Sequence, residues 1–177
     1  RNSVGYPHLP VKICATHAGI SVGEDGATHQ CCEDLALMRT IPGMTVLNPS
    51  DDIEAKAVVK ALLHYDAPAY VRFGRLAVPV INDTPDYHFE IGKGIQLREG
   101  KDATILATGL MVSMALEAAD MLNKEGLSVR VVNIHTIKPI DEEIILKAAK
   151  ETGLLITAEE HSVIGGFGSA VSEVCAE

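Results

Sequence analysis

The stretch ATILATGLMVSMALEAADMLNKEGLSVRVVNI (residues 103–134) decides the fold class of this 177-residue chain. Its two ends are short apolar runs typical of buried strands. The segment between them has the apolar spacing of a helix, with Gly126 placed to end it. A strand, a helix and a second strand in this order predict parallel strands with a covering helix.

The same alternation continues on both sides of this stretch. Toward the C-terminus, Asp141 is placed to open a helix, LLITAEE (154–160) predicts a strand, and GGFGSAVSEV (165–174) predicts the start of another helix. Toward the N-terminus, Asp51 and Glu54 resemble a capping box. Strands and helices are predicted there at residues 11–16, 32–40, 45–50, 51–65 and 69–74. We therefore predict an α/β protein made of two three-layer α/β/α units with mainly parallel sheets.

The composition changes between residues 77 and 90, where two prolines and an Asn-Asp pair interrupt the periodicity. This segment is the best candidate for a linker, and FEIGKGIQLREG (89–100) after it suggests a pair of short extended segments. We expect two domains, residues 1–80 and 81–177. Because the chain opens at Arg1 and stops inside a predicted helix, we also expect a fragment whose last domain is truncated.

Composition disfavours several classes of function. A net charge of -9 opposes binding to nucleic acid, and an aromatic content of 4% without Trp offers no platform for base stacking. No apolar run approaches the roughly 20 residues that a membrane-spanning helix needs. The four cysteines match no disulfide framework, so we expect reduced thiols in a cytoplasmic protein.

The stretch THAGISVGEDGATHQ (residues 16–30) carries the candidate site. His17 follows the first predicted strand, and ligands of parallel α/β sheets bind beyond the carboxyl ends of the strands. The same loop holds Asp25 and His29, with glycines that let the backbone approach a ligand. A histidine donates to phosphate or transfers a proton near neutral pH, and an ionised aspartate accepts from a sugar hydroxyl. The loop is therefore a candidate site for a polyol phosphate.

Two other interpretations of this loop stay open on spacing alone. The histidines and the aspartate can simply hold a polar turn. A zinc site built from His17, His29, Cys31 and Cys32 is disfavoured, because adjacent cysteines project in different directions and the C-x2-C spacing is absent. We predict no metal ligand in this chain.

Longer patterns resemble the transketolase family. The H-x7-D-x3-H pattern of the loop is similar to a loop in the family's pyrimidine-binding domain. PGMTVLNPSDDIEAKAVV (42–59) and PAYVRFGR (68–75) resemble the segments that follow that loop, and AEEHSVIGGFGSAV (158–171) resembles the last stretch of the family's C-terminal domain. The chain departs from the pattern at Ala18 and Ala27, where the family commonly has aspartate and proline.

The resemblance implies a fold, an activity and residue roles. The fold is a partial thiamine-diphosphate-binding pyrimidine-domain fold followed by a domain similar to the transketolase C-terminal domain. The activity is transfer of a two-carbon ketol unit between sugar phosphates, as in the pentose phosphate pathway. His17 and Arg75 correspond to ligands of the sugar phosphate. Asp25 corresponds to the acid that reads a substrate hydroxyl, and His29 to the histidine that faces the cofactor's reactive centre and a substrate oxygen.

The resemblance also implies polypeptide beyond this chain. The family holds thiamine diphosphate, with Mg²⁺ or Ca²⁺, through a GDG-type motif that is absent here. The glutamate that activates the cofactor lies upstream of the loop in the family, and no glutamate precedes His17. We therefore expect an N-terminal transketolase half or subunit as partner, in a homodimer or heterotetramer, and an isolated chain that is inactive.

Other interpretations of the activity stay open. An enzyme like 1-deoxy-D-xylulose-5-phosphate synthase shares a G-x-D-G-x-T-H loop, and the beta subunit of 2-oxo acid dehydrogenases is a weaker fit. Glu24 and the lead-in Thr16–His17 favour transketolase. An interpretation from another class is a non-catalytic assembly or dimerisation module.

Three further features receive structural interpretations. We expect Arg72, which competes with Arg75 for a phosphate role, to form an ion pair with Asp66 or Glu33. The run Glu159–Glu160–His161 is expected to be a surface or interface cluster. The GGFG turn (165–168) does not match a dinucleotide-binding loop, and it is read as a tight turn into a helix whose N–H groups can hold a small anion.

Overall fold

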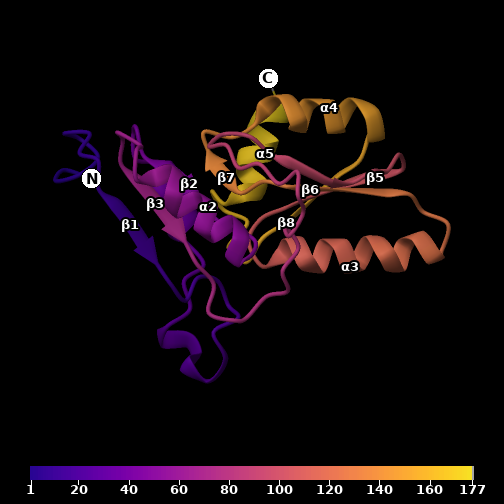
Figure 1. Cartoon of the computed structure of the whole chain (residues 1–177), viewed down its shortest axis with the longest axis horizontal. Coiled ribbons are helices and arrows are strands. Elements are labelled where there is room, and N and C mark those ends of the chain that lie inside the picture. Colours follow the sequence, from indigo (N-terminus) through magenta and orange to yellow (C-terminus); the bar gives the residue numbers. More distant parts are fainter. Residues whose placement is uncertain (177) are drawn as a thin grey trace.

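The computed structural model describes residues 1–176 and contains two β-sheets with helices on their faces (Figure 1). The first sheet has the strand order β1 (Lys12–Ala15), β3 (Ala69–Arg72), β2 (Thr45–Leu47) and β7 (Thr136–Lys138). The second has the order β4 (Ile95–Arg98), β6 (Val129–Asn133), β5 (Ala103–Ala107) and β8 (Leu155–Ala158). The helices are α1 (Asp34–Arg39), α2 (Asp52–Leu62), α3 (Met111–Lys124), α4 (Glu142–Thr152) and α5 (Phe167–Ala176), with a 3₁₀ helix, η1 (Gly23–Thr28), between β1 and α1. Within residues 1–176, no helix is both long and apolar enough to cross a membrane.

Parallel pairing dominates both sheets. The pairs β1–β3, β2–β3, β5–β6 and β5–β8 are parallel, and β2–β7 and β4–β6 are antiparallel. All five residues of β5 are buried, because β5 is an inner strand, with α3 on one face of its sheet and α4 and α5 on the other (Figure 1). The predicted α/β class with two mainly parallel sheets is therefore confirmed.

One strand, β7, lies outside the predicted set. It pairs antiparallel with β2, with Val46 opposite Lys138 and Leu47 opposite Thr136. The second half of the chain therefore contributes a strand to the first sheet. A three-residue strand followed directly by a proline leaves no periodic pattern from which to predict it. Of the two extended segments predicted within residues 89–100, only Ile95–Arg98 forms a strand.

The segment 77–90, predicted to be a linker, contains no helix or strand and is held by the start of α2. Asp51 caps α2 by accepting from the Glu54 N–H at 2.8 Å. Its other oxygen accepts from the N–H groups of Ile81 and Asn82, each at 2.8 Å. The capping box is half formed, because the Glu54 carboxylate bonds to the Ser50 N–H and not to the N–H of Asp51.

A hydrophobic cluster joins the two halves of the chain. It contains Leu35, Val46 and Tyr70 from the first half, together with Leu106, Val132, Ile134, Ile137, Ile145 and Phe167 from the second. Burial of each large aliphatic or aromatic side chain stabilises the fold by about 1.5–3 kcal/mol. The orientation of the second sheet against the first is therefore set by packing, and polar residues between the two can be positioned accurately.

Candidate functional site

The loop of residues 16–33 leaves the carboxyl end of β1 and extends away from both sheets, at the bottom of Figure 1. At its start, His17 has a positive φ of 64°, which is unusual for a residue with a side chain. The next residue, Ala18, donates its N–H to the Phe73 carbonyl at 3.1 Å, beyond the end of β3. This bond ties the loop to the segment that carries Arg75.

The structure brings together all four residues predicted for the site. Arg75 Nε lies 2.6 Å from Asp25 Oδ2, and His17 Nε2 lies 3.5 Å from the same oxygen. The rings of His17 and His29 have centroids 6.3 Å apart and are tilted by 52°. Sequence reasoning did not assign Glu24 to this group, yet its Oε1 lies 3.2 Å from Arg75 Nη2. A guanidinium, two imidazoles and two carboxylates thus converge on one loop.

Neighbouring threonines orient both imidazole rings. The Thr16 hydroxyl lies 3.0 Å from His17 Nδ1, and the Thr28 hydroxyl lies 3.0 Å from His29 Nδ1. Thr28 also donates to the Asp25 carbonyl at 3.4 Å. The contact with Thr28 holds the His29 ring through Nδ1 and leaves Nε2 as the ring nitrogen that can meet a ligand.

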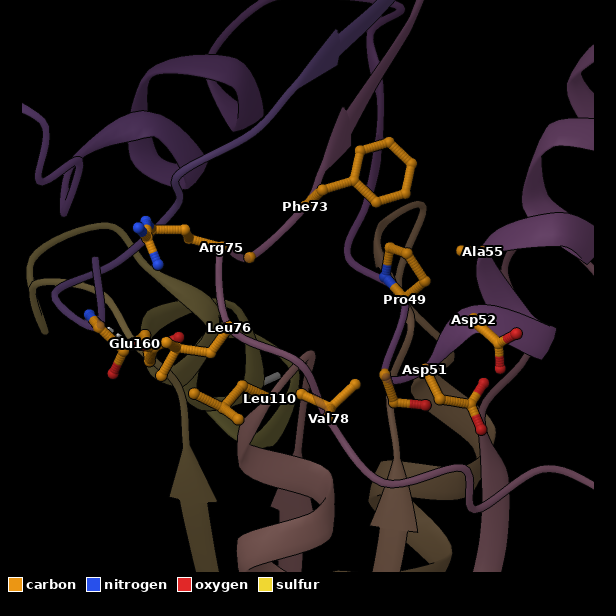
Figure 2. Close-up of a pocket in the computed structure, with 13 residues that line it drawn as sticks. Pro49, Asp51, Asp52, Ala55, Phe73, Arg75, Leu76, Val78, Leu110 and Glu160 are labelled. Carbon is orange, nitrogen blue, oxygen red and sulfur yellow. Dashed lines mark hydrogen bonds between the residues drawn. The ribbon is translucent and has the colours of Figure 1, made fainter. Parts of the chain in front are cut away.

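A cleft of about 190 Å³ lies beside Arg75, between the two halves of the chain (Figure 2). One end carries Arg75 and Glu160, and the other carries Asp51 and Asp52 at the start of α2. Ser21 also lines the cleft and donates its N–H to Glu160. The apolar part of the lining comes from Pro49, Phe73, Leu76, Val78 and Leu110. Arg75 is therefore shared between the loop that holds the histidines and a cleft lined by residues from both halves.

Arg72 forms an ion pair, as predicted, but the predicted partners are wrong. Its Nε donates to Asp34 Oδ2 at 2.8 Å, and the two side chains are only 2% and 7% exposed. Asp66 and Glu33 were the expected partners, but the partner is Asp34, the first residue of α1. The Tyr70 hydroxyl donates to the same oxygen at 2.8 Å, and burial together with this bond raises the tyrosine's pKa. Arg72 is thus held inside the fold through Nε and Nη2, and Arg75 is the more accessible of the two guanidinium groups.

Of the two alternatives expected for Glu159–Glu160–His161, a surface or an interface cluster, the surface cluster is wrong for Glu159 and His161. The His161 side chain is fully buried. The Glu159 carboxylate accepts from the N–H groups of Phe167 and Gly168, at 2.6 and 2.8 Å. The start of α5, considered above as a site for a small anion, is therefore occupied by the chain's own carboxylate. The sequence signal that could have indicated this contact is the position of Glu159, eight residues before the start of α5 at Phe167.

The chemistry of the loop differs from that of a metal site. Among residues 1–176, no group of three or more His, Cys, Asp or Glu side chains is arranged to hold a metal ion. Burial raises the pKa of Cys31 and that of Cys32, which disfavours their thiolate forms. The described residues can bind anions and hydroxyl groups through Arg75 and the histidines, and they offer no cluster for a cation.

Comparison with known proteins covers nearly the whole chain. The family model of the transketolase pyrimidine binding domain matches residues 1–80, and that of the transketolase C-terminal domain matches residues 92–177. A putative transketolase C-terminal section from Methanocaldococcus jannaschii is 51% identical over 99% of this chain and 55% of its own length. A 1-deoxy-D-xylulose-5-phosphate synthase from Heliobacterium modesticaldum is 43% identical over 98% of this chain and 27% of its own length.

A solved structure shares this architecture. It is described as a split gene transketolase in an inactive beta4 tetramer, and it superposes with a TM-score of 0.91 at 52% identity. The match covers 99% of this chain and 56% of that one. The chain therefore spans about half the length of this structure and of the Methanocaldococcus jannaschii relative.

Proposed function

The chain belongs to the transketolase family of thiamine-diphosphate enzymes, and from this we propose that it forms the sugar-phosphate-binding part of a transketolase. The proposed reaction is transfer of a two-carbon ketol unit between phosphorylated sugars, as in the pentose phosphate pathway. We place it in the cytoplasm and divide it into domains at residues 1–80 and 81–177. The observation that carries the proposal is the convergence of His17, Asp25, His29 and Arg75 on one exposed loop.

Phosphate binding is assigned to Arg75 and His17. Asp25 holds Arg75 through Nε and Glu24 contacts Nη2, which fixes the plane of the guanidinium and leaves Nη1 without a hydrogen-bond partner among the described residues. His17 lies on the other side of the same carboxylate oxygen. A guanidinium and an imidazole held around one carboxylate provide several donors for a phosphate dianion.

Asp25 and His29 are assigned to the reacting end of the sugar. Asp25 accepts from a substrate hydroxyl with the oxygen that Arg75 and His17 leave free. His29, oriented by Thr28 through Nδ1, uses Nε2 to exchange a proton with a substrate oxygen and faces the reactive centre of the cofactor. When bound, thiamine diphosphate supplies the carbon nucleophile and the electron sink for cleavage of the carbon–carbon bond.

The remaining machinery is assigned to a partner. Residues 1–176 contain no cluster that could hold the Mg²⁺ or Ca²⁺ of the cofactor's diphosphate. We propose that an N-terminal transketolase half or subunit supplies these ligands and the activating glutamate, in a homodimer or heterotetramer. The chain then supplies only part of the active site, and we expect it to be inactive without the partner.

Reconstitution tests the proposal. The chain is mixed with a matching N-terminal transketolase half, thiamine diphosphate and Mg²⁺, and ketol transfer from a ketose phosphate to an aldose phosphate is measured. His17→Ala and Arg75→Ala should each raise KM for the ketose phosphate by about tenfold or more. Lys56→Ala, on the exposed face of α2, is the matched control. Variants of His17 and Arg75 with wild-type KM and kcat would show that the assigned roles are wrong.

A second candidate function follows from the 1-deoxy-D-xylulose-5-phosphate synthase relative. The same reconstituted protein is given a 2-oxo acid and glyceraldehyde phosphate, and release of carbon dioxide is measured. Transfer without carbon dioxide release supports transketolase, and release supports the synthase-like reaction. If neither activity appears with any matching half, the result favours an assembly module.

A further inference from the structure

Glu160 connects the second half of the chain to the loop that carries both histidines. It follows β8, and its Oε1 accepts a hydrogen bond from the Ser21 N–H at 3.0 Å. Its side chain also packs against Gly19, where an added Cβ would lie 2.6 Å from the Glu160 Cβ. Gly19 has a φ of +77°, so both its conformation and this close approach require glycine.

The backbone of Glu160 is itself fixed. The buried Arg72 donates from Nη2 to the Glu160 carbonyl at 2.7 Å and to the Cys31 carbonyl at 3.2 Å. Its Nε is held by the buried carboxylate of Asp34. One guanidinium thus holds the end of the second sheet and the end of the loop at a constant separation.

The bond from Glu160 acts at the neck of the loop. Gly19 and Cys31 exchange two backbone hydrogen bonds, of 2.9 and 3.1 Å, and so close the neck. Ser21 lies just inside it, where a fixed N–H sets the direction in which the loop leaves. His29 lies inside the closed loop, two residues before Cys31, so a change in this direction moves its imidazole relative to His17, which lies two residues before Gly19.

We infer that Glu160 is a positioning residue for the proposed sugar-phosphate site, acting through Ser21 and the loop neck. The inference rests on the proposed function for its catalytic consequence and on geometry alone for its effect on the loop. Glu160 also shares one end of the cleft with Arg75 (Figure 2), so it stands where the loop, the guanidinium and the second half of the chain meet. The second half of the chain then contributes to the site through Glu160 as well as through packing.

Amide hydrogen exchange of the full chain tests the effect on the loop. Glu160→Ala removes the acceptor of the Ser21 N–H, whereas Glu160→Gln keeps an acceptor oxygen at the same distance. We expect amides of residues 17–31 to exchange about tenfold faster in Glu160→Ala and at the wild-type rate in Glu160→Gln. Glu117→Ala is the matched control, because Glu117 is exposed on α3 and makes no hydrogen bond or ion pair with the described residues. If Glu160→Ala does not fold, Glu160→Asp, which withdraws the carboxylate by one methylene, takes its place.

Kinetics of the reconstituted holoenzyme test the catalytic consequence. We expect kcat/KM for the ketose phosphate to fall about tenfold in Glu160→Ala, with both KM and kcat affected, and to stay within about twofold in Glu160→Gln. Unchanged exchange in Glu160→Ala overturns the inference, and so does faster exchange with wild-type kinetic constants. If the wild-type holoenzyme transfers no ketol unit, the proposed function fails, and the exchange data alone then decide whether Glu160 positions the loop.

Discussion

Arg75 Nε lies 2.6 Å from Asp25 Oδ2, although 50 residues separate the two in sequence. The parallel pairing of β1 with β3 explains this contact. Ala15 at the end of β1 lies opposite Arg72 at the end of β3, so the segments that follow the two strands leave the sheet together. Asp25 at Nε and Glu24 at Nη2 fix the guanidinium, and Nη1 is left to meet a phosphate.

Arg75→Lys should weaken phosphate binding while preserving the charge. Lysine cannot present the planar fork and cannot hold Asp25 through a second nitrogen while it contacts a ligand. In the reconstituted enzyme we expect KM for a ketose phosphate to rise about tenfold with little change in kcat. KM for an unphosphorylated ketose, measured in parallel, should stay at the wild-type value. Equal losses with both sugars would assign Arg75 to another role.

Arg72→Ala should destabilise the whole chain. The substitution leaves the Asp34 carboxylate buried without its cation, and removal of one partner of a buried ion pair costs about 3–5 kcal/mol. Urea unfolding followed by circular dichroism measures the change. Arg75→Ala is the control, since its partly exposed pair should contribute less than about 1 kcal/mol. A loss of similar size in both variants would contradict the assigned difference between the two arginines.

Glu159→Ala should destabilise the start of α5. Two backbone N–H groups lose a charged acceptor, and the loss of such a cap costs about 1–2 kcal/mol. The melting temperature should fall accordingly. Glu173→Ala, which removes an exposed carboxylate from the same helix, should have a smaller effect. Added phosphate should not restore the stability of Glu159→Ala, because the carboxylate is part of the fold.

The sequence predicted which residues gather at the loop better than it predicted the contacts that hold the loop. The resemblance to the transketolase family grouped His17 with Arg75. The structure brings them together because each follows a strand of a parallel sheet and the carboxyl ends of such strands share one edge. The partner of Arg72 could not be predicted, because the choice between Glu33 and Asp34 depends on how α1 docks against β3. The role of Glu160 depends in the same way on the approach of β8 to the first half of the chain. Such long-range contacts leave no local pattern in the sequence.

His135 predicts a pH dependence of stability. Its side chain is fully buried against Phe89, with ring centroids 4.5 Å apart. Burial lowers its pKa from 6.5 to about 4, so the folded chain keeps it neutral where the unfolded chain protonates it. Its contribution is complete above pH 6.5 and is lost as the pH falls toward 4. Acidification from pH 7 to 5 should therefore lower the free energy of unfolding by about 2 kcal/mol through this group.

The buried Glu54 acts in the opposite direction and must be separated from His135. Burial raises the pKa of Glu54, so its contribution is present at low pH and declines as the pH rises above 4.5. When wild type is compared with His135→Gln, the contribution of Glu54 to the free energy of unfolding cancels, because both proteins contain Glu54. Urea unfolding at pH 7, 6 and 5 should give a shallower pH dependence for His135→Gln. Parallel curves for the two proteins would show that His135 is protonated in the folded state and that its pKa is not lowered.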